Sequence, residues 1–321
     1  MKPPILYCIG EAIVDFIPAG ETPDGISLYA PMPGGAPANT SVAAAKLGVR
    51  ASFIGKVGDD GFGRMMIDVM TGYGVSTEYI SQTRDACTTM AFVTLSNEGD
   101  RSFTFARKPG ADMMLTEEEV PYRLFSDIDI LHFGSTGLMP GSPSKAAHLT
   151  ALKAAKSAGT SISYDPNVRL PLWDDPMELK TTILEYLPFA DIVKVSDDEL
   201  DFIFGTDDEH KAAEFCFSQG ASVLFVTRGS AGAAVYTRNF FAETGGVKVN
   251  AVDTTGAGDA FNGAFLSRFL GNTVEESLDP DALTEILNYA NTAGSVTVTR
   301  KGAMAGSPTI EDLESLVRNR D

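Results

Sequence analysis

The chain has few cysteines, few basic residues and no long apolar run, and each of these features excludes some classes of protein. Its 321 residues include three cysteines, Cys8, Cys87 and Cys216, an odd number without the spacing of a metal site. They predict reduced, buried thiols rather than a disulfide framework. Lysine and arginine total 25 against 43 acidic residues, which leaves a net charge of −18. This acidity argues against nucleic acid or an anionic membrane as a partner.

Membrane and secretion signals are also missing from the sequence. No apolar run reaches the length of a transmembrane helix, and the first residues lack a signal-peptide pattern. We therefore expect a cytoplasmic protein. An apolar content of 44% is ordinary for a globular chain. No internal repeat, low-complexity segment or linker divides the sequence, which predicts one domain over residues 1–321.

The stretch that says most about chemistry is Asp-Thr-Thr-Gly-Ala-Gly-Asp at residues 253–259. Three valines within residues 247–252 predict a strand before it, and the apolar run 260–270 predicts a helix after it. The pattern is therefore a strand, a tight turn of small residues and a helix start. The backbone N–H groups of such a turn have no intrahelical partners and lie at the positive end of the helix dipole.

These small residues, Gly256, Ala257 and Gly258, would let a phosphate approach the backbone closely. Asp259 follows them directly. It either caps the helix or accepts a proton from an attacking hydroxyl while the N–H groups hold the developing charge. Oxygen atoms of the preceding Asp-Thr-Thr lie on the other side of the turn, which favours phosphoryl-transfer chemistry over a cap alone.

Alternating strand and helix patterns predict an α/β fold. The first strand is expected over residues 5–17 and the second over 51–57. Because strands and helices then alternate from about residue 115, we expect a parallel-rich central sheet with helices on both faces. The later strands are predicted at 128–133, 161–164, 192–195 and 223–226, and the helices near 143–158, 176–187, 197–204 and 207–218.

Two regions do not fit this alternation and predict a small second layer. Residues 18–33 are rich in proline, glycine and acidic groups, and residues 88–107 form a hairpin pattern with its turn at 97–100. Phe105 and Arg107 share one face of that hairpin by the period of two. The hairpin either packs its aromatic side chains inward or belongs to a β lid, formed by about 16–34 and 87–108, over a polar ligand.

Polar residues near the N-terminus are further candidates for a site. Asp15 interrupts the apolar first strand, so its carboxylate is either paired in the core or faces a ligand. Gly34 and Gly35 allow a close backbone approach just before a predicted helix. Asn39 lies near the start of that helix, where it either caps or hydrogen-bonds a ligand.

A polar loop follows the strand predicted at 161–164. Ligands of open α/β sheets bind at the carboxyl ends of the strands. Asp165 and Asn167 could therefore contact hydroxyls or a hydrated metal, and Arg169 could hold a phosphate. The alternative is an ordinary surface turn.

The end of the next strand carries Lys194, Ser196 and Glu199. Lys194 and Ser196 point the same way along the strand end. Ser196 and Glu199 have the spacing of a capping box at a helix start. A metal–phosphate role for Glu199 is equally compatible with the sequence.

Two of these stretches, residues 34–39 and 253–259, resemble the two signatures of the ribokinase-like (PfkB) carbohydrate kinases. Residues 10–18, 54–63 and 163–173 are similar to the corresponding segments of fructokinases. The resemblance covers nearly the whole chain. It implies a core α/β sheet with a β lid, and transfer of the ATP γ-phosphate to a primary hydroxyl of a sugar.

The resemblance also implies roles for individual residues. Asp259 would be the base, and Gly256, Ala257 and Gly258 the anion hole. Mg²⁺ would bridge the phosphates, with Glu199 near the metal, and a homodimer through the lid is a further expectation. The sugar side comprises Asp15, Gly34, Gly35, Asn39, Phe105, Arg107, Asp165, Asn167 and Arg169.

The nucleotide side and a cation site complete the set that the resemblance implies. K⁺ would lie between two loops and bind mostly backbone oxygens. A protein-only alternative has Asp253 capping the turn and Arg300 pairing with it. The K⁺ residues are Asp253, Thr255, Arg300 and Gly302, and the ATP residues are Lys194, Ser196, Thr227, Gly229, Gly232 and Asn291, the last beside the adenine.

Two departures from the family pattern bear on the substrate. Ser196 stands where many relatives have Asn, and Ala36 stands where ribokinases carry Lys. The second weakens a ribose interpretation and fits the fructokinases. Kinases for 2-keto-3-deoxygluconate or a riboside remain alternatives, since Arg107 or Arg169 could supply a cation for a carboxylate. A non-catalytic sugar-binding regulator is the third hypothesis.

Overall fold

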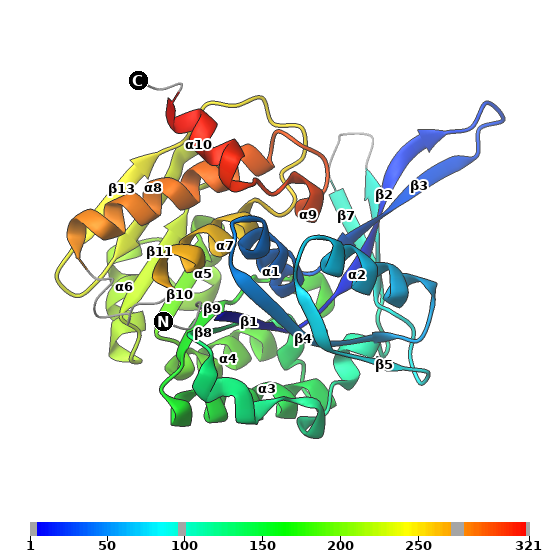
Figure 1. The fold of residues 1–321 in the computed structure, drawn as a ribbon, viewed down its shortest axis with the longest axis horizontal. Coiled ribbons are helices and arrows are strands. Elements are labelled where there is room, and N and C mark those ends of the chain that lie inside the picture. The colour runs from blue at the N-terminus through cyan, green and yellow to red at the C-terminus, as the bar shows by residue number, and fades with distance from the viewer. Residues whose placement is uncertain (1–4, 96–100, 271–278, 319–321) are drawn as a thin grey trace.

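A nine-stranded sheet forms the centre of the molecule, in the order β13-β12-β11-β10-β9-β8-β1-β4-β5 (Figure 1). The computed structural model describes residues 5–95, 101–270 and 279–318. Neighbouring strands from β11 to β5 are parallel, and β12 and β13 add antiparallel strands at one edge. The strands are β1 (Ile5–Ile9), β4 (Arg50–Gly58), β5 (Ser76–Thr83), β8 (Ile130–Gly134), β9 (Ser161–Asp165), β10 (Ile192–Ser196), β11 (Val223–Thr227), β12 (Gly232–Tyr236) and β13 (Phe241–Gly245).

Helices cover both faces of this sheet and bury two separate apolar clusters against it. One face carries α1 (Ala36–Lys46), α2 (Gly61–Gly72), α7 (Ala257–Phe269), α8 (Pro280–Thr297), α9 (Ala303–Gly306) and α10 (Ile310–Arg318). The other face carries α3 (Pro143–Ala158), α4 (Pro176–Tyr186), α5 (Asp197–Phe204) and α6 (Glu209–Ser218). The α/β class and the parallel-rich sheet that the sequence predicted are confirmed.

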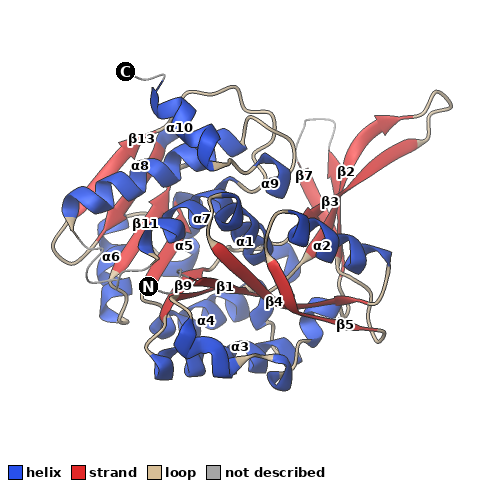
Figure 2. Ribbon diagram, in the orientation of Figure 1, coloured by secondary structure: helices blue, strands red, loops and turns tan. Residues whose placement is uncertain are grey.

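A second, four-stranded sheet lies beside the main one, in the order β3-β2-β6-β7 (Figure 2). Its strands are β2 (Ile13–Glu21), β3 (Ser27–Gly34), β6 (Met90–Leu95) and β7 (Arg101–Ala106). The β2–β3 hairpin extends away from the body of the molecule in both views. The turn predicted at residues 97–100 lies outside the described residues.

The single first strand expected over residues 5–17 is wrong. Strand β1 ends at Ile9, and the chain crosses to the second sheet, where Val14 N donates to Thr89 O at 3.0 Å. Gly10 makes this crossing possible, because a Cβ on it would lie 2.6 Å from Cγ of Pro37. The crossing leaves Glu11 at the boundary between the two sheets.

The strand predicted at 247–252 is also wrong. Strand β13 ends at Gly245, and the chain then continues as an irregular loop to Gly256. Val249 and Val252 are 40% and 55% exposed. β-Branched residues favour a strand only where they pack on a sheet face, and these do not. Within the described residues, no helix is both long and apolar enough to cross a membrane.

Candidate active site

A cavity of about 960 Å³ opens at the carboxyl edge of the central sheet and reaches the second sheet. Its wall contains Ile13, Asp15 and Phe105 from the second sheet, together with the loop before α7. The cavity brings together most residues that the sequence singled out. Among those residues, only Gly34, Asp253, Arg300 and Gly302 do not line it.

The turn before α7 has the geometry of an anion site. Gly256 is the N-cap residue with a left-handed φ of 80°, and no side chain of the described residues caps the helix. A Cβ on Gly256 would lie 2.4 Å from Cβ of Ala303 in α9, so the turn packs directly on α9 and requires glycine there. Ala257 N makes a long bond of 3.4 Å to Thr254 O, and the next N–H groups of α7 can face an anion in the cavity.

Asp259 lies in the first turn of α7 and is held from α1. The Nδ2 of Asn39 donates to its Oδ2 at 2.8 Å. Helices α1 and α7 approach closely at Gly263, where a Cβ would lie 2.6 Å from Cβ of Ala43. Burial raises the pKa of Asp259 to about 6 against the lowering effect of the Asn39 hydrogen bond, and the nearby Asp165 contributes to the rise. The other amide atom of Asn39, Oδ1, is buried in the cavity wall and finds no partner within the described part of the chain.

Asp165 and Lys194 form a buried pair beneath the turn. Lys194 Nζ lies 3.2 Å from Asp165 Oδ2, and Asn262 Nδ2 donates to the same oxygen at 2.7 Å. Burial alone would lower the pKa of Lys194, but the surrounding carboxylates of Asp165, Glu199 and Asp259 hold it above the usual value. Lys194 therefore stays charged. Its Nζ would lie 3.1 Å from a Cβ on Gly258, so this cation sits beside the anion turn.

The sequence grouped Asp165 and Asn167 with the sugar contacts. In the structure the other Asp165 oxygen accepts from Asn167 N at 3.0 Å, so both carboxylate oxygens have protein partners. Asn167 itself has a positive φ of 47°. Arg169 is exposed at the cavity mouth and donates to Val168 O at 3.1 Å.

Arg107 does not offer the free cation that the sequence suggested. Its guanidinium is buried and bonded to Asp112, with Nε at 2.9 Å and Nη2 at 2.5 Å from Oδ2. Nη2 also donates to Thr136 O at 2.9 Å, and Nη1 lies against the sulfur of Met139. The sequence analysis did not predict a role for Asp112. This residue lies in a short turn after β7 and belongs to no recognisable motif.

Asp15 and Phe105 bring the second sheet into the site. Gly34 pairs with Ile13 in the sheet, and a Cβ on Gly34 would lie 2.4 Å from Asp15 Oδ2. Gly34 thus makes room for the carboxylate. Burial raises the pKa of Asp15 to about 6, although Arg169 opposes the rise.

The opposite end of the cavity is formed by the ends of β10 and β11 and by α8. Thr227, Gly229, Gly232 and Ser196 line it, as the sequence grouped them. A Cβ on Gly232, whose φ is 111°, would lie 2.0 Å from Thr244 O, so the chain needs glycine there. At this end the cavity wall continues from the turn before α7 to the loop after β13.

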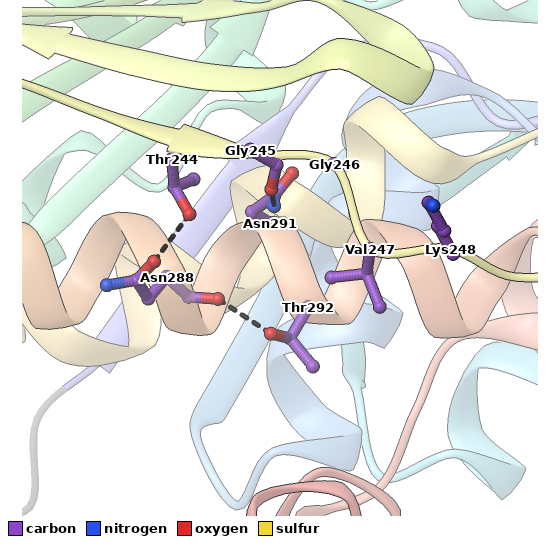
Figure 3. Close-up of a pocket in the computed structure, with 8 residues that line it drawn as sticks. All are labelled: Thr244, Gly245, Gly246, Val247, Lys248, Asn288, Asn291 and Thr292. Carbon is purple, nitrogen blue, oxygen red and sulfur yellow. Dashed lines mark hydrogen bonds between the residues drawn. The ribbon is translucent and has the colours of Figure 1, made fainter. Parts of the chain in front are cut away.

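Asn291 lies between this end and a neighbouring cavity of about 430 Å³ (Figure 3). Its Nδ2 donates to Gly245 O at 3.0 Å. Thr244 Oγ1 donates to Asn288 Oδ1 at 2.6 Å, which ties the end of β13 to α8. Val247 and Lys248 also line the smaller cavity.

Glu199 forms the capping box that was one of its two predicted roles. Its Oε2 accepts from Ser196 N at 2.8 Å, and its Oε1 accepts from Val168 N at 2.6 Å. Among the described residues no group of three or more His, Cys, Asp or Glu side chains could hold a metal ion. Both carboxylate oxygens of Glu199 are thus already bonded to backbone N–H groups.

The side chain of Asp253 links the two loops that were expected to bind K⁺. Asp253 Oδ2 accepts from Gly302 N at 3.0 Å, and its Oδ1 accepts from Thr255 N at 3.0 Å. The predicted pairing of Arg300 with Asp253 is wrong: Arg300 forms a two-pronged pair with Asp312 at 2.8 and 2.7 Å. Asp312 lies in α10, 12 residues further along the chain. Local sequence spacing therefore did not predict this pairing.

Comparisons with known proteins identify the family of the chain. The model of the pfkB family carbohydrate kinases matches residues 5–310. Probable fructokinase-4 of Arabidopsis thaliana is 40% identical over 320 residues, covering 98% of this chain and 97% of the relative. Fructokinase-2 of Solanum lycopersicum is 40% identical over 323 residues, covering 98% and 96%.

Solved structures of fructokinases are also similar to this chain. The fructokinase of Xylella fastidiosa with bound ATP superposes with a TM-score of 0.91 at 31% identity, covering 98% of both chains. The fructokinase of Vibrio cholerae O395 bound to fructose, ADP and calcium gives 0.87 at 34% identity, covering 97% of this chain and 98% of that one. The chain belongs to the pfkB family of carbohydrate kinases.

Proposed function

We propose that this protein is an ATP-dependent fructokinase that phosphorylates a primary hydroxyl of fructose, with Asp259 as the base. The observation that carries the proposal is the placement of Asp259. It stands beside the open N–H groups of the turn at Gly256, and Asn39 fixes its orientation at 2.8 Å. A binding protein without catalysis would need neither the turn nor the carboxylate.

The proposed reaction uses the groups in a simple order. The sugar hydroxyl donates its proton to Asp259 as its oxygen attacks the γ-phosphorus. The backbone N–H groups of the turn at Gly256, Ala257 and Gly258 and the ammonium of Lys194 would stabilise charge on the transferred group, with Ala257 N leaving its long bond to Thr254 O. Asp165 keeps Lys194 in place. Mg²⁺ bound to ATP would neutralise part of the phosphate charge.

Asp15 and Asn39 line the cavity and are proposed to hold sugar hydroxyls, and Phe105 to cover the sugar. We take the second sheet, with residues 16–34 and 87–108, as a lid on a single domain. A lid would keep water from competing with the sugar for the γ-phosphoryl group. Thr227, Gly229, Gly232, Ser196 and Asn291 would bind ATP.

The alternative substrates make different demands on the site. A keto acid such as 2-keto-3-deoxygluconate needs a cation for its carboxylate, and the buried pair with Asp112 already neutralises Arg107. Arg169 is the cation that remains for it. The hydroxyls of a riboside could meet the same groups as those of fructose, but its base would need a further partner. Fructose, which carries neither a carboxylate nor a base, makes the fewest unmet demands.

Comparing kcat/KM for fructose, ribose and 2-keto-3-deoxygluconate with ATP tests the proposal. We expect fructose to be the best substrate and the product to carry phosphate on a primary hydroxyl. A preference of about tenfold or more for the keto acid, which corresponds to about 1.4 kcal/mol of transition-state binding, would transfer the proposal to that activity. No turnover with any sugar would favour the regulator hypothesis.

We also propose a K⁺ site, a cellular location and an oligomeric state. K⁺ between the loops of Thr255 and Gly302 would stiffen the anion turn through backbone oxygens. A cytoplasmic location follows from the sequence argument alone. Exposed Ile26, Leu28 and Tyr29 on the β2–β3 hairpin support a homodimer through the lid, which light scattering would detect as twice the monomer mass.

A further inference from the structure

Asn262 is a buried polar residue of α7 for which the proposed reaction has given no role. It interrupts the apolar run after the anion turn, is 0% exposed and is not part of the described cavity wall. Its Nδ2 donates to Asp165 Oδ2 at 2.7 Å. Its Oδ1 finds no hydrogen-bond partner in the described part of the chain. Because Asn262 is shut off from the cavity, any effect that it has on the reaction passes through Asp165.

The unmet oxygen indicates that packing alone does not account for asparagine at position 262. A buried amide oxygen without a partner opposes folding. Leucine has nearly the same shape and no polar atom, so it would fill the space between helix and sheet without that cost. What leucine lacks is a donor for Asp165. The donated hydrogen bond is therefore the property that distinguishes Asn262.

The contacts of Asn262 lead back to the helix from which they start. Asp165 Oδ2 also binds Lys194 Nζ, at 3.2 Å, and Lys194 Nζ would lie 3.1 Å from a Cβ on Gly258. Gly258 and Asn262 are four positions apart on α7, so they share one face of the helix. The buried Asp165–Lys194 pair lies against that face. Asp259 follows Gly258 directly, so this ring of contacts also places the ammonium relative to the proposed base.

Two donors share one oxygen of Asp165, and this sharing determines where the ammonium lies. Asn262 and Lys194 both donate to Oδ2, while Oδ1 accepts from Asn167 N at 3.0 Å. Without the amide of Asn262, Oδ2 would keep only the ammonium of these two donors, and the opposite charges would draw together. That movement would take the ammonium away from Gly258 and from an anion at the turn.

We propose that Asn262 is a positioning residue: by donating to Asp165 it holds the ammonium of Lys194 against the anion turn, where the transferred phosphoryl group gains charge. This inference rests on the proposed kinase activity and deepens it. Asn262 itself touches no substrate. It keeps the cation from β10 and the base from α7 at a fixed separation. The sequence analysis treated residues 260–270 as one apolar run and did not predict this role.

A double-mutant cycle tests the route through Lys194. Asn262→Leu should lower kcat with the best sugar about tenfold and leave KM for that sugar within about twofold of wild type. In a Lys194→Met background the same change should lower kcat less than about twofold, because the ammonium that it misplaces is gone. The melting temperature should stay near that of wild type. Ser267→Ala, which removes a hydrogen bond to Ala264 O on the same helix, is the matched control and should have wild-type kcat.

An unchanged kcat in Asn262→Leu would overturn the inference. An equal loss of kcat with and without Lys194 would also overturn it, because a merely structural role gives that result. If leucine does not fit, Asn262→Ala removes the donor without adding bulk and enters the same cycle.

The failure of the proposed function would look different. A wild type that prefers another sugar would contradict that function, and the cycle would still decide this inference with the preferred sugar. If wild type phosphorylated no sugar, calorimetry would decide it. Asn262→Leu should then bind ATP about threefold more weakly than wild type and ADP equally well, since the ammonium is placed for the terminal phosphate. Equal affinities of the two proteins for ATP would overturn the inference.

Discussion

Three carboxylates in one cavity share an environment that disfavours their charged forms. Burial raises the pKa values of Asp15 and Asp259 to about 6 and that of Glu11 to about 7. The proposed roles of two of them require the ionised form: Asp259 must accept a proton, and Asp15 must accept hydrogen bonds. Because the raised pKa values place protonation just below neutrality, activity should depend on pH there.

We therefore predict that kcat/KM for fructose is highest above pH 7 and falls as the pH is lowered through about 6. The sign follows from the two carboxylates, which lose function on protonation. A flat profile from pH 5 to 8, with coupling enzymes in excess, would contradict these assignments.

At this scale the sequence predicted which residues gather but not how they pair. It grouped Asp165 with sugar contacts and Lys194 with ATP, and the structure joins the two at 3.2 Å. The sequence left Arg107 available for a ligand, whereas the structure pairs it with Asp112. Pairings such as these join positions that are far apart along the chain or that only a turn brings together. Local spacing carries no signal for them.

Among the elements, the short helix α9 supports the anion turn. Ala303 lies against Gly256, and Lys46 at the end of α1 donates to the carbonyls of Met304, Ala305 and Ser307. Asp253 ties the turn to Gly302, just before α9. Protein groups thus already connect the elements that K⁺ was expected to join, so the ion would add stiffness to an existing scaffold.

The proposed K⁺ site predicts a cation-specific effect on turnover. In a buffer free of K⁺ and NH₄⁺, added KCl should raise kcat about two- to tenfold above tetramethylammonium chloride at equal ionic strength. The reason is better preorganisation of the N–H groups toward the γ-phosphate. KM for fructose should change little. Equal rates in the two salts would show that Asp253 and its partners close the loops alone.

Element types followed from the sequence wherever periodicity was strong. The helices from α3 to α6 and the strands between them agree with the predicted ranges because apolar periods and caps act locally. The prediction failed at 10–12, where a close approach to Pro37 turns the chain into another sheet. It failed again at 247–252, where valines found no sheet to pack on. Both failures depend on tertiary contacts.

On the scale of the whole molecule, the site lies where two sheets meet. The central sheet supplies Lys194 and the loop with Asp259, and the second sheet supplies Asp15 and Phe105. The second sheet is joined to the first through the crossing at Gly10 and Glu11. In the proposed closure of this sheet, Asp15 and Phe105 would move relative to the base on α7.

The central claim is that Asp259 acts as the base beside the anion turn, and Asp259→Asn tests it most directly. Calorimetry should give dissociation constants for fructose and ATP within about threefold of wild type, because asparagine keeps the shape and can still bond Asn39. The melting temperature should not fall, since a carboxylate with a raised pKa opposes folding at neutral pH. We predict a loss in kcat of at least ~10². Turnover within a few-fold of wild type, with both ligands bound normally, would contradict the account.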